Sequence, residues 1–237
     1  SLNSDDLDDS YFENSDYLIH TAFQPLLTKK ELDVNFLGTQ KLIKKCRKYN
    51  VTFIFLSTVS AQENITSRYS KSKLKIESIL DPKKDLILKL GLVIGNGGLF
   101  LRMFNFIKKS PIVPIFDSGK QQMQYICLSD ITDICLKSIT NFIPGKFVIV
   151  DDSSISTKKL YRQLAKLVNK KILFISFSST LAYNILKFTE YLKLPLPVSS
   201  ENMLGLKNMT YLSQCLPNTV DKKNLKNFQK SVEFLKQ

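Results

Sequence analysis

Tyr69 and Lys73 have the residue types and the spacing for acid–base chemistry on a hydroxyl or carbonyl group. They stand four residues apart in a segment of helical pattern, so that their side chains share one helix face. A tyrosine with a pKa of about 10 is a poor base at neutral pH, unless a neighbouring ammonium stabilises its phenolate. Such a pair could move a proton to or from a hydroxyl while hydride moves at the same carbon.

The surroundings of this pair matter, because its spacing alone is not specific. Nine tyrosines and 30 lysines in 237 residues produce about one such spacing by chance, and a second occurs at Tyr183 and Lys187. A solvated helix face is the alternative interpretation of either pair. Upstream of Tyr69, an apolar run ends in the hydroxyl-rich residues 57–60. Open parallel sheets bind their ligands at the carboxyl ends of such strands.

Short apolar runs alternate with longer amphipathic segments, which is typical of parallel strands joined by crossover helices. Strands are expected at residues 17–22, 51–57, 86–93, 126–128 and 147–150, and helices at 28–49, 69–80, 99–109, 129–141, 156–168, 180–192 and 222–235. A Ser/Asp cap is expected to open the helix 129–141. The pattern predicts an α/β fold: a Rossmann-like parallel sheet with helices on both faces and a smaller C-terminal substrate lobe.

Composition narrows the class of partner. The net charge is +13, yet the basic residues are 30 Lys and only four Arg, spread along the chain without aromatic interleaving. This does not indicate nucleic-acid binding, whereas a positive field would help to capture an anionic small molecule. No run reaches the roughly 18 to 20 apolar residues of a membrane span, and the acidic start is unlike a signal peptide. We expect a cytoplasmic protein with no membrane partner.

Metal chemistry is not indicated. The chain has four scattered cysteines and one histidine, His20, and these offer no ligand spacing for zinc. His20 lies in an apolar run, where a core residue is expected.

Several segments, in this order and spacing, resemble the extended short-chain dehydrogenases/reductases, the NAD-dependent epimerase/dehydratase family. They are IHTA (19–22), NFLGT (35–39), the strand end 57–60, YxxxK (69–73) and LKLGLVIGNGG (88–98). The resemblance covers about residues 5–140 and continues more weakly through GKFVIVDDSSIS (145–156). It implies an enzyme that binds NAD or NADP, with NAD favoured.

The resemblance also implies roles for single residues. Tyr69 would be the general acid/base and Lys73 its electrostatic partner, and both would contact the cofactor. Thr58 would hydrogen-bond the reacting oxygen, with Ser57 as the alternative. The other cofactor contacts would be Asp6 and Leu7 at adenine, Thr21 and Ala22 at the strand end, Asn35 near the active site and Gly91 at nicotinamide. Asn35 as a helix anchor and Gly91 as a packing glycine are the alternatives.

The sequence departs from the family in two ways. The family begins with a strand and a GxxGxxG turn that binds pyrophosphate, and this chain contains no such motif. We therefore expect residues 1–110 to form an NAD(P)-binding domain that is incomplete at its N-terminus, and 111–237 to form the remaining strands and an interwoven substrate lobe. Leu92 and Met123 stand where the family often has asparagine and arginine, with Lys108 or Lys120 as alternative contacts for a diphosphate.

Three functions remain open at this point. The first is an NAD(P)-dependent epimerase, dehydratase or reductase acting on a nucleotide-activated sugar in polysaccharide biosynthesis. The second is a reductase of a non-sugar carbonyl or hydroxyl compound, and the third is a catalytically silent remnant that no longer binds cofactor. An unsheltered sheet edge would favour a homodimer.

Overall fold

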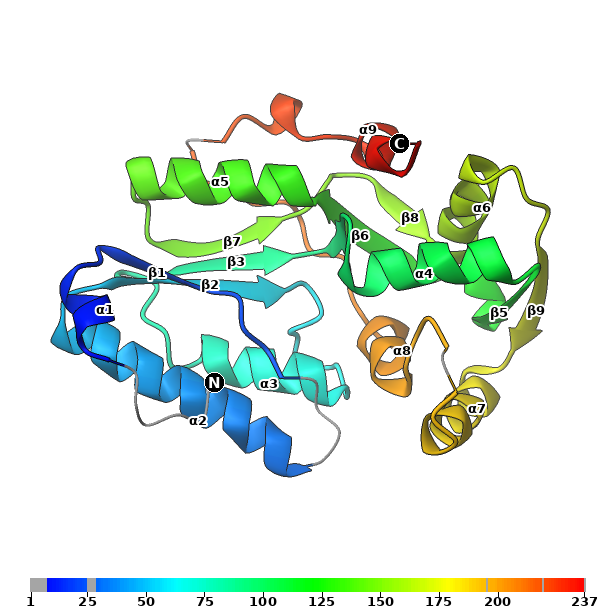
Figure 1. The fold of residues 1–237 in the computed structure, drawn as a ribbon, viewed down its shortest axis with the longest axis horizontal. Helices are drawn as coiled ribbons and strands as arrows, with labels where there is room; N and C mark the ends of the chain where they lie inside the picture. The colour runs from blue at the N-terminus through cyan, green and yellow to red at the C-terminus, as the bar shows by residue number, and fades with distance from the viewer. Residues whose placement is uncertain (1–7, 25–28, 195, 219, 237) are drawn as a thin grey trace.

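A computed structural model describes residues 8–24, 29–194, 196–218 and 220–236. Its larger sheet has the order β1 (Tyr17–His20), β2 (Thr52–Thr58), β3 (Leu86–Leu90) and β7 (Gly145–Ile149), and all neighbours are parallel. Helices α2 (Lys29–Lys48) and α3 (Arg68–Glu77) cover one face, and α5 (Leu128–Thr140) covers the other (Figure 1). The predicted α/β fold, with a Rossmann-like parallel sheet between helices, is confirmed.

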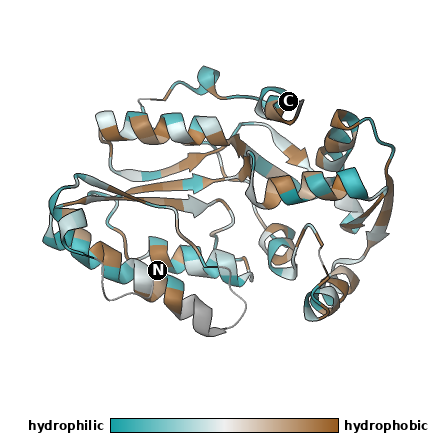
Figure 2. Ribbon diagram, viewed as in Figure 1, coloured by the Kyte–Doolittle hydropathy of each residue, from teal (hydrophilic) through white to brown (hydrophobic). Residues whose placement is uncertain are grey.

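Burial on both faces explains why these strands read as apolar runs. Along β2, Phe53 and Phe55 pack toward α2 and α3, while Ile54 packs toward α5. Successive side chains of a strand alternate between faces, so each face needs its own apolar residues. Figure 2 shows the result as largely hydrophobic strands between helices of mixed character.

A second lobe is built around a smaller sheet. Strand β6 (Gln122–Cys127) pairs with β4 (Leu92–Ile94) in parallel and with β8 (Ser154–Ser156) in antiparallel orientation. Helices α4 (Gly98–Lys109) and α6 (Thr157–Leu167) pack together there. Strands β5 (Ile112–Phe116) and β9 (Leu173–Phe177) form a separate parallel pair, followed by α7 (Ser179–Tyr191) and α8 (Ser200–Lys207). Figure 1 shows this lobe beside the larger sheet.

Gly91 separates the two sheets. A single strand was predicted over 86–93, but the chain leaves the first sheet at Leu90 and enters the second at Leu92. A Cβ atom on Gly91 would lie 2.5 Å from the Gln124 carbonyl oxygen in β6. Only a residue without a side chain permits this approach of two backbones, so Gly91 has the packing role expected as one alternative. Its contact with nicotinamide stays a prediction.

Other expectations differ from the structure in detail. The helix predicted over 222–235 is wrong: this segment holds only α9 (Phe228–Ser231) and the 3₁₀ turns Lys222–Asn224 and Glu233–Lys236. The predicted Ser/Asp cap of α5 is also wrong, because the helix begins at Leu128 with Cys127 as its N-cap. Unpredicted elements are α1 (Ser10–Glu13), β5, β8, the 3₁₀ turn Asp117–Gly119, β9 and α8. Within the described ranges, no helix has the length and apolarity to cross a membrane.

Candidate active site

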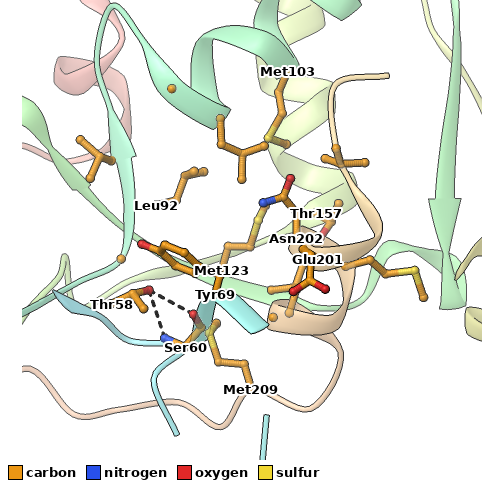
Figure 3. Close-up of a pocket in the computed structure, with 18 of the residues that line it drawn as sticks. Thr58, Ser60, Tyr69, Leu92, Met103, Met123, Thr157, Glu201, Asn202 and Met209 are labelled. Carbon is orange, nitrogen blue, oxygen red and sulfur yellow. Dashed lines mark hydrogen bonds between the residues drawn. The ribbon is translucent and has the colours of Figure 1, made fainter. Parts of the chain in front are cut away.

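A pocket of about 610 Å³ lies between the larger sheet and the second lobe. Its walls come from the end of β2, the first turn of α3, the Gly91 crossing, the loop before α4, strand β6 and helix α8. Thr58 and Tyr69 both line it, as expected for residues at the carboxyl edge of a parallel sheet. Figure 3 shows the Tyr69 ring on the same side of the pocket as Thr58 and Ser60.

Tyr69 stands in the first turn of α3, which Ser67 caps by accepting a hydrogen bond from the Ser70 N–H. Its side chain is 37% exposed. Within the described residues its hydroxyl makes no hydrogen bond, and its ring meets the edge of Phe23 at 4.9 Å between centroids. Burial raises the pKa of Tyr69 to about 12. This direction is opposite to the one expected from a neighbouring ammonium, because desolvation and not the Lys73 charge determines the pKa of Tyr69. The group is a neutral phenol at physiological pH, with its proton available to a ligand.

Lys73 lies one turn further along α3 and is buried, with its Nζ donating to the Leu56 carbonyl oxygen at 2.8 Å. The ammonium lies over the rings of Phe55 and Phe23, at 4.6 and 5.1 Å. Burial lowers the pKa of Lys73 to about 8, although the Glu77 carboxylate acts in the opposite direction. Phe23 contacts both members of the pair, and nothing in the sequence pattern predicted this contact.

Thr58 rather than Ser57 faces the pocket. The Thr58 and Ser60 hydroxyls lie 3.1 Å apart, and Ser70 donates a hydrogen bond to Ser60 at 2.9 Å. These hydroxyls join the end of β2 to the helix that carries Tyr69. The Ser57 side chain is buried on the other side of the strand end and donates to Glu77. The alternative role given to Ser57 at the reacting oxygen is therefore wrong.

Glu77 is a buried carboxylate that pairs with two lysines, the buried Lys89 and the exposed Lys146. Its carboxylate pairs with Lys89 at 3.1 Å and with Lys146 at 3.0 Å. The Lys89 ammonium also donates to the Ala61 carbonyl oxygen at 2.6 Å, and burial lowers its pKa. A buried charge is costly without a partner of opposite charge. The Glu77 carboxylate has two such partners, and its charge also acts on the Lys73 ammonium.

The expected cofactor contacts have different outcomes. Thr21 and Ala22 are exposed at the carboxyl end of β1. Asn35 is buried, and its amide accepts from the Gln24 N–H at 2.8 Å and donates to the Gln24 carbonyl oxygen at 3.0 Å. This anchors the segment after β1 to α2, which is the structural alternative expected for Asn35. Asp6 and Leu7 lie outside the described residues.

His20 is a core residue, as expected. Its Nε2 lies 2.9 Å from the Thr39 hydroxyl, which donates its own proton to the Asn35 carbonyl oxygen. Nε2 must therefore be the donor to Thr39. The ring packs between Phe53 and Phe55, and burial, assisted by the Lys73 charge, lowers the pKa of His20 to about 4.

The second YxxxK pair belongs to the surface of α7. Lys187 pairs with Glu190 at 3.5 Å and lies 5.8 Å from the centre of the Tyr183 ring. Neither residue lines the pocket. The surrounding motifs therefore separate the candidate catalytic pair from a chance occurrence of the same spacing.

Helix α8 supplies a wall of the pocket that was not predicted. It begins at a capping box in which Ser199 and Asn202 exchange hydrogen bonds, a sequence signal that could have indicated a helix start. Glu201 accepts a hydrogen bond from the backbone N–H of Arg68 at 2.6 Å and another from its Nε at 3.1 Å. A carboxylate from the second lobe thus satisfies a backbone N–H at the N-terminus of α3, the helix that carries Tyr69.

The residues present fit the reactive end of a nicotinamide cofactor. The Tyr69 hydroxyl lacks a protein partner among the described residues, and the Lys73 ammonium has three donors but one hydrogen bond, to Leu56. Tyr69 lines the pocket at the carboxyl edge of the sheet, where such ligands bind, whereas Lys73 is buried behind it. The described residues hold no group of three or more acidic, histidine or cysteine side chains suited to a metal.

Solved structures share this fold. No protein-family model and no curated protein matches the sequence. UDP-glucose 4-epimerase from Thermotoga maritima, solved with UDP-glucose, is 20% identical with a TM-score of 0.56, over 84% of this chain and 80% of its own. RMD from Pseudomonas aeruginosa, complexed with NADPH, is 13% identical with a TM-score of 0.56, over 81% and 79%. MoeE5, in complex with UDP-glucuronic acid and NAD, is 18% identical with a TM-score of 0.60, over 75% and 70%.

Proposed function

We propose that the chain is an extended short-chain dehydrogenase/reductase that moves hydride between NAD(P) and a carbon bearing a hydroxyl or carbonyl group. The observation that carries the proposal is the Tyr69 hydroxyl, which makes no hydrogen bond to any described residue. It lines the same pocket as Thr58, and Tyr69 shares a helix face with the buried Lys73. The motifs around these residues and the fold of the solved structures support the same assignment.

Tyr69 acts as the proton donor when a carbonyl is reduced. Its pKa of about 12 keeps the phenol protonated before the reaction, and Thr58 donates a second hydrogen bond to the same substrate oxygen. A reduced nicotinamide, when bound, would supply the hydride for this reduction. The Lys73 ammonium favours the phenolate that remains after proton transfer. Because burial lowers the pKa of Lys73 to about 8, this assistance weakens in alkaline solution.

A nucleotide-activated sugar is the substrate class that the ligands of two solved structures suggest. Its diphosphate would need cationic or backbone donors in this chain. Lys108 and Lys120, the side chains considered for this role, are exposed and do not line the pocket, whereas Leu92 and Met123 do. The lining therefore gives the sugar-nucleotide substrate no direct support.

Replacement of Tyr69 tests the catalytic proposal. Purified protein should be stabilised against heat by NADH or NADPH, and it should consume the reduced cofactor with a carbonyl substrate. Tyr69→Phe should retain cofactor binding and reduce turnover by roughly a hundredfold or more, because the proton donor is lost. Tyr183→Phe, at the surface YxxxK pair, is the matched control and should be fully active.

Two results would contradict the proposal. One is the absence of any response to both reduced cofactors. The other is full activity of Tyr69→Phe under conditions in which the chemical step limits the rate.

A further inference from the structure

All four methionines of the chain line this one pocket. They come from separate parts of the sequence: Met103 from α4, Met123 from β6, Met203 from α8 and Met209 from the segment after α8. The described lining comprises 30 of 237 residues. If the four methionines were placed at random, about half a methionine would be expected in this lining, and all four are there. Figure 3 shows Met123 and Met209 near the Tyr69 ring and Met103 on the far side of the pocket.

Methionine walls suit apolar ligands of irregular shape. The side chain is unbranched, rotates about three bonds and ends in a polarisable thioether, and it therefore adapts to different apolar surfaces. Much of the remaining lining is aliphatic as well, including Leu92, Leu99 and Leu206. Binding to such a surface is favoured mainly by burial of apolar ligand surface, and the surface offers few hydrogen-bond partners to the hydroxyl groups of a sugar.

The pocket is also depleted of positive charge. Lysine and arginine make up 34 of the 237 residues, and about four would be expected among the 30 lining residues, yet the described lining contains none. Its one charged residue is Glu201, an anion that is paired with Arg68. A diphosphate in this space would meet a carboxylate and no cation, although the net charge of the whole chain is +13.

Most polar side chains of the lining are already occupied. The Gln124 amide donates to the Leu212 carbonyl oxygen at 2.7 Å and accepts from its N–H at 3.1 Å. Thr157 donates to the Gln121 carbonyl oxygen at 3.3 Å. The Asn202 oxygen accepts from the Ser199 N–H and hydroxyl, both at 3.0 Å. Among the described lining residues, the hydroxyls of Tyr69 and Tyr161 and the Asn96 side chain make no hydrogen bond, and the Thr58 hydroxyl is shared with Ser60 at 3.1 Å. The lining therefore offers only a few polar contacts to a ligand.

We propose that the pocket binds an uncharged, predominantly apolar ketone, aldehyde or secondary alcohol. Its carbon skeleton lies against the four methionines, and its one polar oxygen meets Tyr69 and Thr58. The position of the reacting oxygen rests on the proposed function; the apolar character of the ligand rests on the lining alone. Nucleotide sugars bind this pocket more weakly.

Methyl groups of methionine provide a direct readout. Protein labelled with ¹³C at the methionine methyls has four reporters, and every one of them lies in the pocket lining. Leu136→Met adds a fifth at an exposed position of α5 and serves as the internal reference. The labelled protein is titrated separately with 2-tetralone, 2-decalone, UDP-glucose and UDP, without cofactor.

The expected result is that at least one of the two ketones moves the pocket signals, leaves the reference in place and binds at least tenfold more tightly than UDP-glucose. The proposal is overturned if UDP-glucose moves these signals at an equal or lower concentration than the ketones. It is also overturned if neither ketone moves them. Because no hydride transfer is needed, loss of turnover with intact ketone binding would count against the proposed function and not against this inference.

A charge placed in the wall gives a second test. Met209 is half-buried, so that a lysine there can reach water and the fold can persist. Met209→Lys should weaken ketone binding at least tenfold and strengthen UDP-glucose binding, whereas Met209→Leu should bind ketone as the parent does. Equal ketone affinities of the two variants would contradict the proposal, and the signals of the buried Met103, Met123 and Met203 verify folding in each.

Discussion

Replacement of Lys73 by methionine should make the protein more stable and inactive. Lys73 is 4% exposed, and burial lowers its pKa from 10.5 to about 8. A shift of about 2.5 units, at about 1.36 kcal/mol per unit, corresponds to about 3 kcal/mol of stability lost at neutral pH through holding this charge in the fold. Met has a similar length and no charge to desolvate.

The sign of the pH dependence follows from the lowered pKa. Below pH 8 both the folded and the unfolded chain carry the proton, and the whole cost is present. Between about pH 8 and 10.5 the folded protein releases the proton first, so the unfolded chain binds more protons and the stability of the parent rises with pH. The advantage of Lys73→Met should therefore shrink by about 3 kcal/mol over this interval.

Urea unfolding of parent and variant at several pH values from 7 to 10.5 measures this difference. The variant also removes the hydrogen bond to the Leu56 carbonyl oxygen, which costs about 1 kcal/mol, but this loss does not change with pH. Lys71→Met, at an exposed position of the same helix, controls for adding a methionine to α3. A stability difference that stays constant from pH 7 to 10.5 would refute the reasoning.

Three further outcomes are expected. Gly91→Ala should destabilise the protein by roughly 1–3 kcal/mol, seen as a lower urea midpoint, because its Cβ would lie within 2.8 Å of three backbone atoms of β6; an unchanged midpoint would contradict the close approach. Burial lowers the pKa of His20 to about 4, so the parent should lose about 3 kcal/mol of unfolding free energy as pH falls from 6.5 to 4. His20→Gln should not show this loss in urea unfolding at several pH values; parallel curves of stability against pH for the two proteins would contradict it. Thr58→Val should lower kcat by roughly tenfold to a hundredfold while cofactor binding persists, because a donor to the reacting oxygen is lost; an unchanged kcat would remove Thr58 from the reaction.

The larger sheet could be predicted because its strands are buried on both faces. Leu86–Leu90 and Thr52–Thr58 read as apolar runs, and the helical spacing of Tyr69 and Lys73 fixes both on one face of α3. The split at Gly91 could not be predicted, because the apolar run continues through it and the break depends on contact with β6, some 30 residues later. Strand β5 was missed for a local reason: Pro114 interrupts a run of five residues.

The pocket was less predictable than the pair of residues that defines it. Whether Ser57 or Thr58 faces the ligand depends on the direction of a single strand end, and the buried Glu77 settles it. The contact of Phe23 with Tyr69 and Lys73 is tertiary and leaves no periodic signal. The gathering of the four methionines likewise appears only when α4, β6 and α8 are brought together.

The ion pair between Arg68 and Glu201 connects α3 and α8, although the two residues are 133 positions apart in the sequence. Helix α8 forms one wall of the pocket. Its Glu201 carboxylate also accepts a hydrogen bond from the Arg68 N–H at the start of α3, the helix that carries Tyr69. Any outward swing of α8 that admits a ligand or releases a product must stretch this tether. Such a movement of α8, whether a ligand enters or a product leaves, would therefore also change the contacts of the helix turn that carries Tyr69.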